Sequence, residues 1–374
     1  MAARTNRLDS YQRAHDWLGL PIAVVYKLVD DQGAYLAALI AYYGFLSVFP
    51  LVLLGATILG FVLKGNPSLQ HSLLSSALSH FPVIGAQIQH NIHAYTGSGL
   101  ALVISIVVAL YGALGIAQAS QNAMNIIWGV PRNARPNLLK ARLRSLVLLV
   151  LLGFGVLATT ALSALATGAQ SLGDGVHLGT VVGLLAIVAS AALNASLFVI
   201  AFRALTIRRT TLRDVALGAI AASVGWEVLQ ILGTYYLAHK LKGSREVYGA
   251  FALVIGLLAW IYVEALIVVL CAELNAVLRR RLWPRSLFTP FTDNVELTPA
   301  DEQSYSSYAQ AQRFKGFERI GVTFERGLPA TPVAELIPGA RELPGAEGTG
   351  GEAAGAGTGE HSFPAPAPKP ANSA

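Results

Sequence analysis

Six long apolar stretches occupy residues 34–278 and constrain the fold more than any other feature of the chain. They run over approximately Ala34–Leu63, Gly99–Gln121, Ser145–Thr167, Leu178–Phe202, Val215–Ala238 and Tyr248–Leu278. Each reaches the roughly 20 residues that a helix needs to cross a hydrocarbon layer about 30 Å thick. A surface helix of a soluble protein keeps a polar face, which these stretches lack. The pattern therefore predicts an all-α, polytopic integral membrane protein with six transmembrane helices.

The basic residues are distributed unevenly between the two sides of these predicted helices. Seventeen Lys and Arg residues flank them in the N-terminal segment, the second loop, the fourth loop and just after the sixth helix. The other side has only Lys64, Lys240, Lys242 and Arg245. Because loops rich in Lys and Arg stay in the cytoplasm, both termini are predicted to be cytoplasmic. The net charge of +6 thus arises largely from membrane-flanking residues, and no nucleic-acid partner is predicted.

Composition divides the chain into three regions. Residues 1–33 mix charged and apolar side chains and are predicted to form a cytoplasmic, amphipathic segment with short helices at the membrane surface. Residues 34–282 form the predicted six-helix membrane domain. Residues 283–374 are expected to be a cytoplasmic, largely disordered tail, because residues 339–374 are rich in Gly, Ala, Pro and Glu. In the first external loop, apolar residues recur at helical spacing and predict two amphipathic helices on the outer face.

Acidic residues are scarce in the membrane region. Between Asp31 and Glu227 the chain has only Asp174 and Asp214. A metal-dependent nuclease or hydrolase needs clustered Asp, Glu or His ligands, and no such cluster is evident. The sequence also lacks a phosphate-binding glycine-rich loop and a nucleophile elbow. It therefore predicts a protein that is not an enzyme and that has no metal or cofactor.

Glu227 and Glu264 lie near the centres of the fifth and sixth predicted helices. A charged side chain at the bilayer centre costs about 2.5–3.5 kcal/mol on insertion scales, so both should face the protein interior or a water-filled cavity. Polar residues on other helix faces accompany them, and Pro50 predicts a kink or partial break in the first helix. We predict that nine residues of these helices line a pathway for a substrate or an ion. They are Tyr43, Ser47, Pro50, Gln121, Asn122, Asn125, Glu227, Gln230 and Glu264.

Two alternatives remain open for these polar and small residues. Ser, Thr, Asn and Gln on interior faces are commonly hydrogen-bonded between helices and serve packing alone. Small residues at GxxxG-like spacing, such as Gly218 with Ala222, allow close approach either within the chain or between copies in a homo-oligomer.

The ordered motifs of the membrane region resemble the YihY/virulence factor BrkB family of bacterial inner-membrane proteins. The motifs are Ala37–Pro50, Gln121–Trp128, Val247–Phe251, Leu257–Tyr262 and Ala272–Asn275. The resemblance covers roughly residues 15–282. It departs from the family at Cys271, where Gly is usual, and only packing is expected to change.

The resemblance implies a six-span helical protein of the bacterial cytoplasmic membrane. Some members are linked to the export of glycolipids, which implies a transporter or translocase of a lipid or other amphiphilic substrate. In that hypothesis the midplane carboxylates bind a proton or a cation. The alternative is a non-transporting scaffold that organises envelope partners. A membrane ribonuclease, a label that the family once carried, is disfavoured by the missing ligand cluster.

Overall fold

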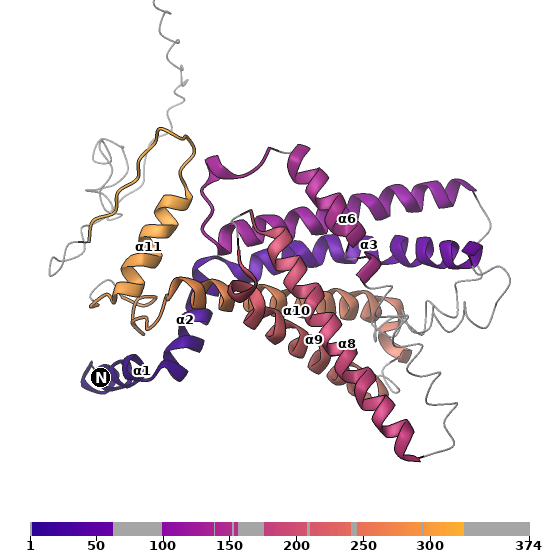
Figure 1. The fold of residues 1–374 in the computed structure, drawn as a ribbon, viewed down its shortest axis with the longest axis horizontal. Coiled ribbons are helices and arrows are strands. Elements are labelled where there is room, and N and C mark those ends of the chain that lie inside the picture. The colour runs from indigo at the N-terminus through magenta and orange to yellow at the C-terminus, as the bar shows by residue number, and fades with distance from the viewer. Residues whose placement is uncertain are drawn as a thin grey trace, which may run out of the picture. The chain divides into compact units, whose positions relative to one another are not determined.

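The computed structural model describes residues 2–62, 99–137, 139–151, 153–155, 176–207, 210–240, 245–292 and 295–324. These residues lie in one compact unit, Met1–Arg326, and they contain helices and no strand. The all-α class is therefore confirmed for the part of the chain described. The helices are α1 (Ala2–Ala14), α2 (Asp16–Asp30), α3 (Gly33–Val62), α6 (Gly99–Ile127), α8 (Val176–Leu205), α9 (Leu212–Lys240), α10 (Arg245–Arg280) and α11 (Pro299–Ala311) (Figure 1). Residues 139–151 and 153–155 are also helical, and a short 3-10 helix covers Arg132–Ala134.

Helices occupy the described parts of all six predicted spans. Among these residues, Leu212–Gly233 and Val254–Arg280 are long and apolar enough to cross a membrane, with mean hydropathies of 1.7 and 2.5. Gly33–Val48 and Ala191–Leu205 are shorter apolar segments. Residues 156–167 of the third span and the amphipathic helices predicted in the first external loop lie outside the described residues.

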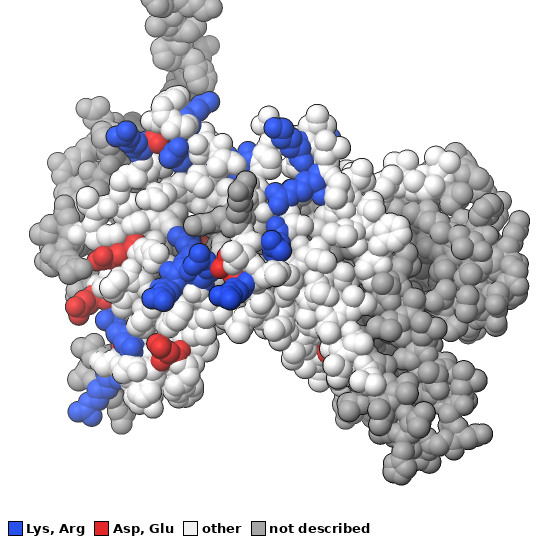
Figure 2. All heavy atoms as spheres, viewed as in Figure 1, with Lys and Arg blue, Asp and Glu red and all other residues white. Residues whose placement is uncertain are grey.

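Large apolar side chains point outward along the long helices. Val107 of α6 is 61 % exposed, Val188 of α8 is 59 % exposed and Ile231 of α9 is 68 % exposed. Large apolar side chains exposed in such number are unfavourable in water and suit contact with lipid. On the face drawn in Figure 2, Lys, Arg, Asp and Glu gather around α1, α2, α11 and the nearby loops, whereas the described parts of the long helices are almost free of charge.

Polar contacts between sequence-distant segments bring the predicted basic loops to one end of the helices. These contacts are Lys27–Glu273, Asn133–Arg313, Arg144–Thr206 and Arg279–Asp214. They join the N-terminal segment, the second loop, the fourth loop and the segment after α10. We call this assembly the charged end; it consists of α1, α2 and the described residues of the ranges 128–144, 205–214 and 279–320. The grouping is the one that the distribution of Lys and Arg predicts.

Helix α3 packs between α6 and α10 through glycines. A Cβ atom added at Gly112 of α6 would lie 2.6 Å from the Cβ of Ser47, and one at Gly44 of α3 would lie 2.9 Å from Ile261 of α10. α3 continues through Pro50 to Val62, so the partial break predicted there is not observed. Proline removes one backbone hydrogen bond, and neighbouring helices can support the turns on either side of it.

Helices α9 and α10 pack closely at Gly218. A Cβ atom added there would lie 2.3 Å from the backbone oxygen of Cys271. The Gly218 N–H donates a hydrogen bond of 2.7 Å to Oδ1 of Asn275. Gly218 therefore permits close packing of two helices within the chain. Packing within the chain was one of the two alternatives that the GxxxG-like spacing left open.

Gly218→Ala is expected to destabilise the protein by about 1–3 kcal/mol, the range typical of overpacked cores. The new methyl group would meet backbone, which cannot rotate away, so α9 and α10 would have to separate. Thermal unfolding in detergent micelles would measure the effect. Gly153→Ala is the matched control, because no atom of the described residues lies within 4 Å of the position of its Cβ atom. Equal melting temperatures for the two variants would contradict the prediction.

Candidate functional site

Glu227 and Glu264 are half-buried on adjacent helices. Glu227 of α9 accepts a hydrogen bond of 3.1 Å from Nδ2 of Asn194 on α8. Glu264 of α10 accepts one of 2.6 Å from Nε1 of Trp260, one helical turn earlier on the same face. Within the described residues, neither carboxylate forms an ion pair with Lys, Arg or His. Each carboxylate is therefore held by a neutral donor.

The packing of α9 on α10 places these two carboxylates at the same level. Gly218 faces Cys271, Gly225 faces Ile267 and Gly233 faces Trp260, so the two helices run antiparallel in a defined register. Interpolation along that register puts Glu264 opposite the turn of α9 that contains Glu227. Glu227 bonds toward α8, whereas Glu264 lies on the face of α10 that packs against α9. The pair thus shares a depth, with no direct hydrogen bond between the two side chains among the described contacts.

The predicted pathway residues of α3 lie close to this level. Gly44 packs against Ile261, which is one turn from Glu264. The Tyr43 ring lies edge-on to the ring of Tyr111, with centroids 6.3 Å apart. Ser47 is buried and donates to the backbone oxygen of Gly44 over 2.9 Å. Pro50 is half-buried one turn further along α3, and Gln230 is half-buried one turn after Glu227.

The three predicted residues of α6 lie nearer the charged end. Gly115 packs against Tyr43, and Gln121 is six residues further along α6, a rise of about 9 Å. Gln121 donates to Oγ of Ser145 over 2.8 Å. The structure therefore separates the predicted pathway residues into two groups rather than bringing all of them together.

Asn122, which follows Gln121, is also engaged at the charged end. Oδ1 of Asn122 accepts a hydrogen bond of 3.1 Å from Nη1 of Arg135 in the second loop. Asn125 is buried, and its Oδ1 has no hydrogen-bond partner within the described residues. Gln121 and Asn122 thus tie α6 to the segment that follows it.

A buried ionic cluster at the charged end was not predicted from the sequence. Lys27 of α2 forms ion pairs with Asp31 and, over 3.2 Å, with Oε2 of Glu273 on α10. The Lys27 and Asp31 side chains are each 2 % exposed, and the Glu273 side chain is fully buried. We call these three residues the Lys27 cluster. Burial lowers the pKa of Lys27, but the two carboxylates outweigh burial and hold that pKa above its ordinary value.

A second buried cluster joins both terminal regions. The Arg285 side chain is 1 % exposed and donates through Nη1 to Asp30 over 2.6 Å and through Nε to Asp301 over 2.9 Å. Asp301 also belongs to the capping box of α11, in which Thr298 is the N-cap residue. The Tyr308 hydroxyl donates to Asp30 over 3.2 Å. Burial raises the pKa of Tyr308, so this phenol stays protonated and acts as a donor.

Weak sequence signals for these clusters exist. Lys27 and Asp31 have the i, i+4 spacing of a helical ion pair, and Asp30-Asp31 immediately precedes the first apolar stretch. Arg285 was counted only as a flanking charge, and Asp301 falls in the segment expected to be largely disordered. The described part of that segment contains α11, and residues 325–374 lie outside the described residues.

No group of three or more His, Cys, Asp or Glu residues is placed to hold a metal ion in the part of the chain that the structure describes. The described residues therefore present two carboxylates within apolar helices, Glu227 and Glu264, and a charged end whose buried acidic and basic side chains form ion pairs with one another.

Comparison with known proteins identifies the family. The family model described as Virulence factor BrkB matches residues 24–290, which confirms the resemblance seen in the motifs. Inner membrane protein YhjD of Escherichia coli is 24 % identical over 270 residues, covering 68 % of this chain and 80 % of the relative. UPF0761 membrane protein RSc1559 of Ralstonia nicotianae is 32 % identical over 212 residues, covering 54 % and 44 %. Putative ribonuclease-like protein YfkH of Bacillus subtilis is 24 % identical over 262 residues, covering 68 % and 93 %. No solved structure matches the chain.

Proposed function

Because the chain belongs to the virulence factor BrkB family of membrane proteins, we propose that it translocates a lipid or another amphiphilic substrate across the cytoplasmic membrane. In this proposal α3, α6, the helix that begins at residue 139, α8, α9 and α10 are the six spans. The charged end faces the cytoplasm, since loops rich in Lys and Arg are retained on that side.

The observation that carries the proposal is the pair of carboxylates at one level of α9 and α10. Glu227 and Glu264 each have a neutral donor, Asn194 and Trp260, and no basic partner among the described residues. An ionisable residue inside a membrane span is expensive and marks a functional site by default. Proton or cation binding at Glu227 and Glu264 is therefore proposed to drive or gate the movement of the substrate, next to Tyr43 and Ser47 of α3.

A scaffold without transport activity is the alternative, and one observation favours it. Gln121 and Asn122 of α6 were expected in the pathway, yet both are engaged in bonds to the following segment. Bonds of that kind support packing rather than passage. The two functions differ in whether purified protein moves an amphiphile by itself.

Glu227→Gln and Glu264→Gln, singly and together, are expected to reduce transport and to change its pH dependence. The glutamine side chain keeps the size of glutamate and can still accept one hydrogen bond through its oxygen, but it cannot take up a proton. The measurement uses the full chain in vesicles and follows the movement of a fluorescent phosphatidylglycerol between leaflets at several pH values. Glu296→Gln is the matched control, because this exposed glutamate lies at the charged end.

The expected result is that wild type and Glu296→Gln move the probe at equal rates and that the double variant falls to the rate of protein-free vesicles. Unchanged rates and pH profiles in all three variants would overturn the role of the carboxylates. A wild-type protein that moves no amphiphile tested would favour the scaffold.

A further inference from the structure

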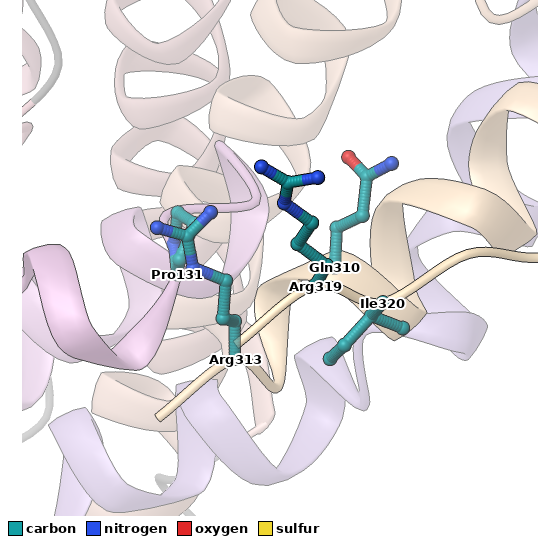
Figure 3. A pocket seen from close by; sticks show the side chains of 5 residues that line it. All are labelled: Pro131, Gln310, Arg313, Arg319 and Ile320. Carbon is teal, nitrogen blue, oxygen red and sulfur yellow. The ribbon is translucent and has the colours of Figure 1, made fainter. Parts of the chain in front are cut away.

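A pocket of about 320 Å³ lies at the charged end, where the segment after α11 meets the second loop. Its lining residues are Pro131, Gln310, Arg313, Arg319 and Ile320 (Figure 3). The volume is at the lower end of the range of small-molecule sites, about 300–1,000 Å³. Two guanidinium groups, one amide and two apolar side chains therefore line a space large enough for a small charged group.

The pocket depends on contacts between sequence-distant segments. The backbone N–H of Asn133 donates to the backbone oxygen of Arg313 over 3.1 Å. Nε of Arg132 donates to Oε1 of Gln312 over 3.0 Å, and its guanidinium lies 5.0 Å from the centroid of the Phe314 ring. These bonds fix the position of the segment that carries Arg313 and Arg319 against the second loop.

The two lining arginines keep donors available. Arg313 donates through Nε to the backbone oxygen of Lys315 and through Nη2 to that of Gly316, which leaves Nη1 unused in the described contacts. Within the described residues, no hydrogen bond or ion pair engages Arg319, and Figure 3 shows its guanidinium pointing the same way as the Gln310 amide. Five N–H donors in a planar fork match the oxygens of a carboxylate or phosphate.

Glu318, the residue before Arg319, does not line the pocket. Oε2 of Glu318 accepts hydrogen bonds from the backbone N–H groups of Phe314 and Lys315, over 2.8 and 3.1 Å. These two bonds hold the pKa of Glu318 below its ordinary value. The carboxylate is thus satisfied within its own turn, and the lining of the pocket keeps a positive charge.

Two aromatic side chains of the same segment are exposed. Phe314 is 59 % exposed and Phe317 is 88 % exposed. Aromatic residues beside basic ones are typical of segments that lie at a membrane surface. Lipid phosphate groups lie where the apolar part of a membrane ends. The charged end lies at one end of the apolar helices, so such a phosphate group would be accessible to this segment.

We propose that the pocket formed by Arg313, Arg319 and Gln310 binds a phosphate-bearing anion, with Arg319 as its main ligand. The bound group is either the phosphodiester of an anionic phospholipid or a free phosphate, since both present the same oxygens to the guanidinium groups. Binding would strengthen the contact between the second loop and the segment after α11. The site does not depend on whether the protein transports a substrate.

The test compares Arg319→Gln with Lys315→Gln in the full chain. Both variants remove one positive charge from the same exposed turn, but only Arg319 lines the pocket. One arm titrates inorganic phosphate into the protein in neutral detergent and follows binding by calorimetry. The other arm adds phosphatidylglycerol to the micelles and counts retained lipid by native mass spectrometry, with phosphatidylcholine as the zwitterionic control.

Arg319→Gln is expected to weaken binding about tenfold, as loss of a charge-assisted hydrogen bond does, and Lys315→Gln to change it less than about twofold. Binding of phosphatidylglycerol without binding of phosphate identifies a lipid site, whereas binding in both arms identifies a site for the phosphate group itself. Equal losses in the two variants, or no binding in either arm, would overturn the proposal. Arg319→Lys is expected to retain partial binding, and folding of every variant is checked by its melting temperature.

Discussion

Lys27→Met is expected to lower the free energy of unfolding by about 3–5 kcal/mol, the range for removing one partner of a buried ion pair. The substitution keeps an unbranched apolar stem of similar shape and removes the ammonium group. Asp31 and Glu273 would then share a buried site with no cation. Neither oxygen of Glu273 accepts a hydrogen bond in the described contacts, so this carboxylate depends on Lys27 most strongly.

Denaturation by sodium dodecyl sulfate from neutral micelles would measure the change in free energy. Lys140→Met is the control, because Lys140 is exposed at the same end. Lys27→Met combined with Glu273→Gln should recover part of the loss, since the double variant no longer buries an unpaired carboxylate. Stability equal to wild type in Lys27→Met would show that the ion pairs contribute nothing.

The pH at which this experiment is run follows from the pKa of Lys27. The folded protein holds that pKa above its ordinary value of 10.5. The stabilisation from Lys27 is therefore complete below the pKa of the unfolded chain and is lost as the pH rises through the folded pKa. The ammonium group of Lys27 should consequently stay charged across neutral pH, and its contribution to the free energy of unfolding should be lost only in strongly alkaline solution.

Arg285→Met is expected to lower the free energy of unfolding by about 3 kcal/mol and to release the segment after α10 from α2. Arg285 is the one residue in this cluster that contacts both Asp30 and Asp301. Asp301 would retain the N–H groups of Ser286 and Thr298, whereas Asp30 would keep only the Tyr308 hydroxyl among the described donors. The loss should therefore be concentrated at the contact with α2.

Limited proteolysis of the detergent-solubilised protein would detect that release as faster cleavage between α10 and α11. Arg285→Lys should also lose most of the stabilisation that Arg285 provides, because a single ammonium nitrogen cannot occupy the two separate positions from which Nη1 and Nε reach Asp30 and Asp301. Arg279→Met is the contrasting control. Its ion pair with Asp214 involves a side chain that is 60 % exposed, and such pairs contribute about 0–1 kcal/mol. Similar losses for Arg279→Met and Arg285→Met would contradict the assignment of the buried cluster.

Further hydrogen bonds join α1 and α2 to the segment after α10. Tyr26 donates to the backbone oxygen of Leu287 over 2.7 Å, and Asp9 accepts from the backbone N–H of Leu287 over 2.9 Å. Gln12 donates to the backbone oxygen of Arg285 over 2.5 Å. The segment before α3 and the segment after α10 thus contribute to one assembly at the charged end. The family model, which matches residues 24–290, covers only part of that assembly.

The candidate site was predictable in part. Glu227 and Glu264 could be identified from the sequence, because a carboxylate inside a long apolar stretch is visible without knowing how the helices pack. Their common level required the register of α9 on α10, which Gly218, Gly225 and Gly233 set through contacts that no local pattern specifies. Gln121 and Asn122 were predicted to line the same pathway because they are polar residues in or next to a predicted transmembrane helix. Their partners, Ser145 and Arg135, show that they belong to the charged end.

The sequence by itself determined the helices and the end at which their basic loops meet. Hydrocarbon offers the backbone no hydrogen-bonding partner, so a long apolar segment must satisfy its own N–H and C=O groups as a helix, and this is readable locally. Only the tertiary structure decided that Gly218 packs within the chain, that Lys27 pairs with Glu273, and that Arg285 joins Asp30 to Asp301. Arg285 and Asp30 are 255 positions apart, and the energy of such a pair depends on burial and distance rather than on any spacing along the chain.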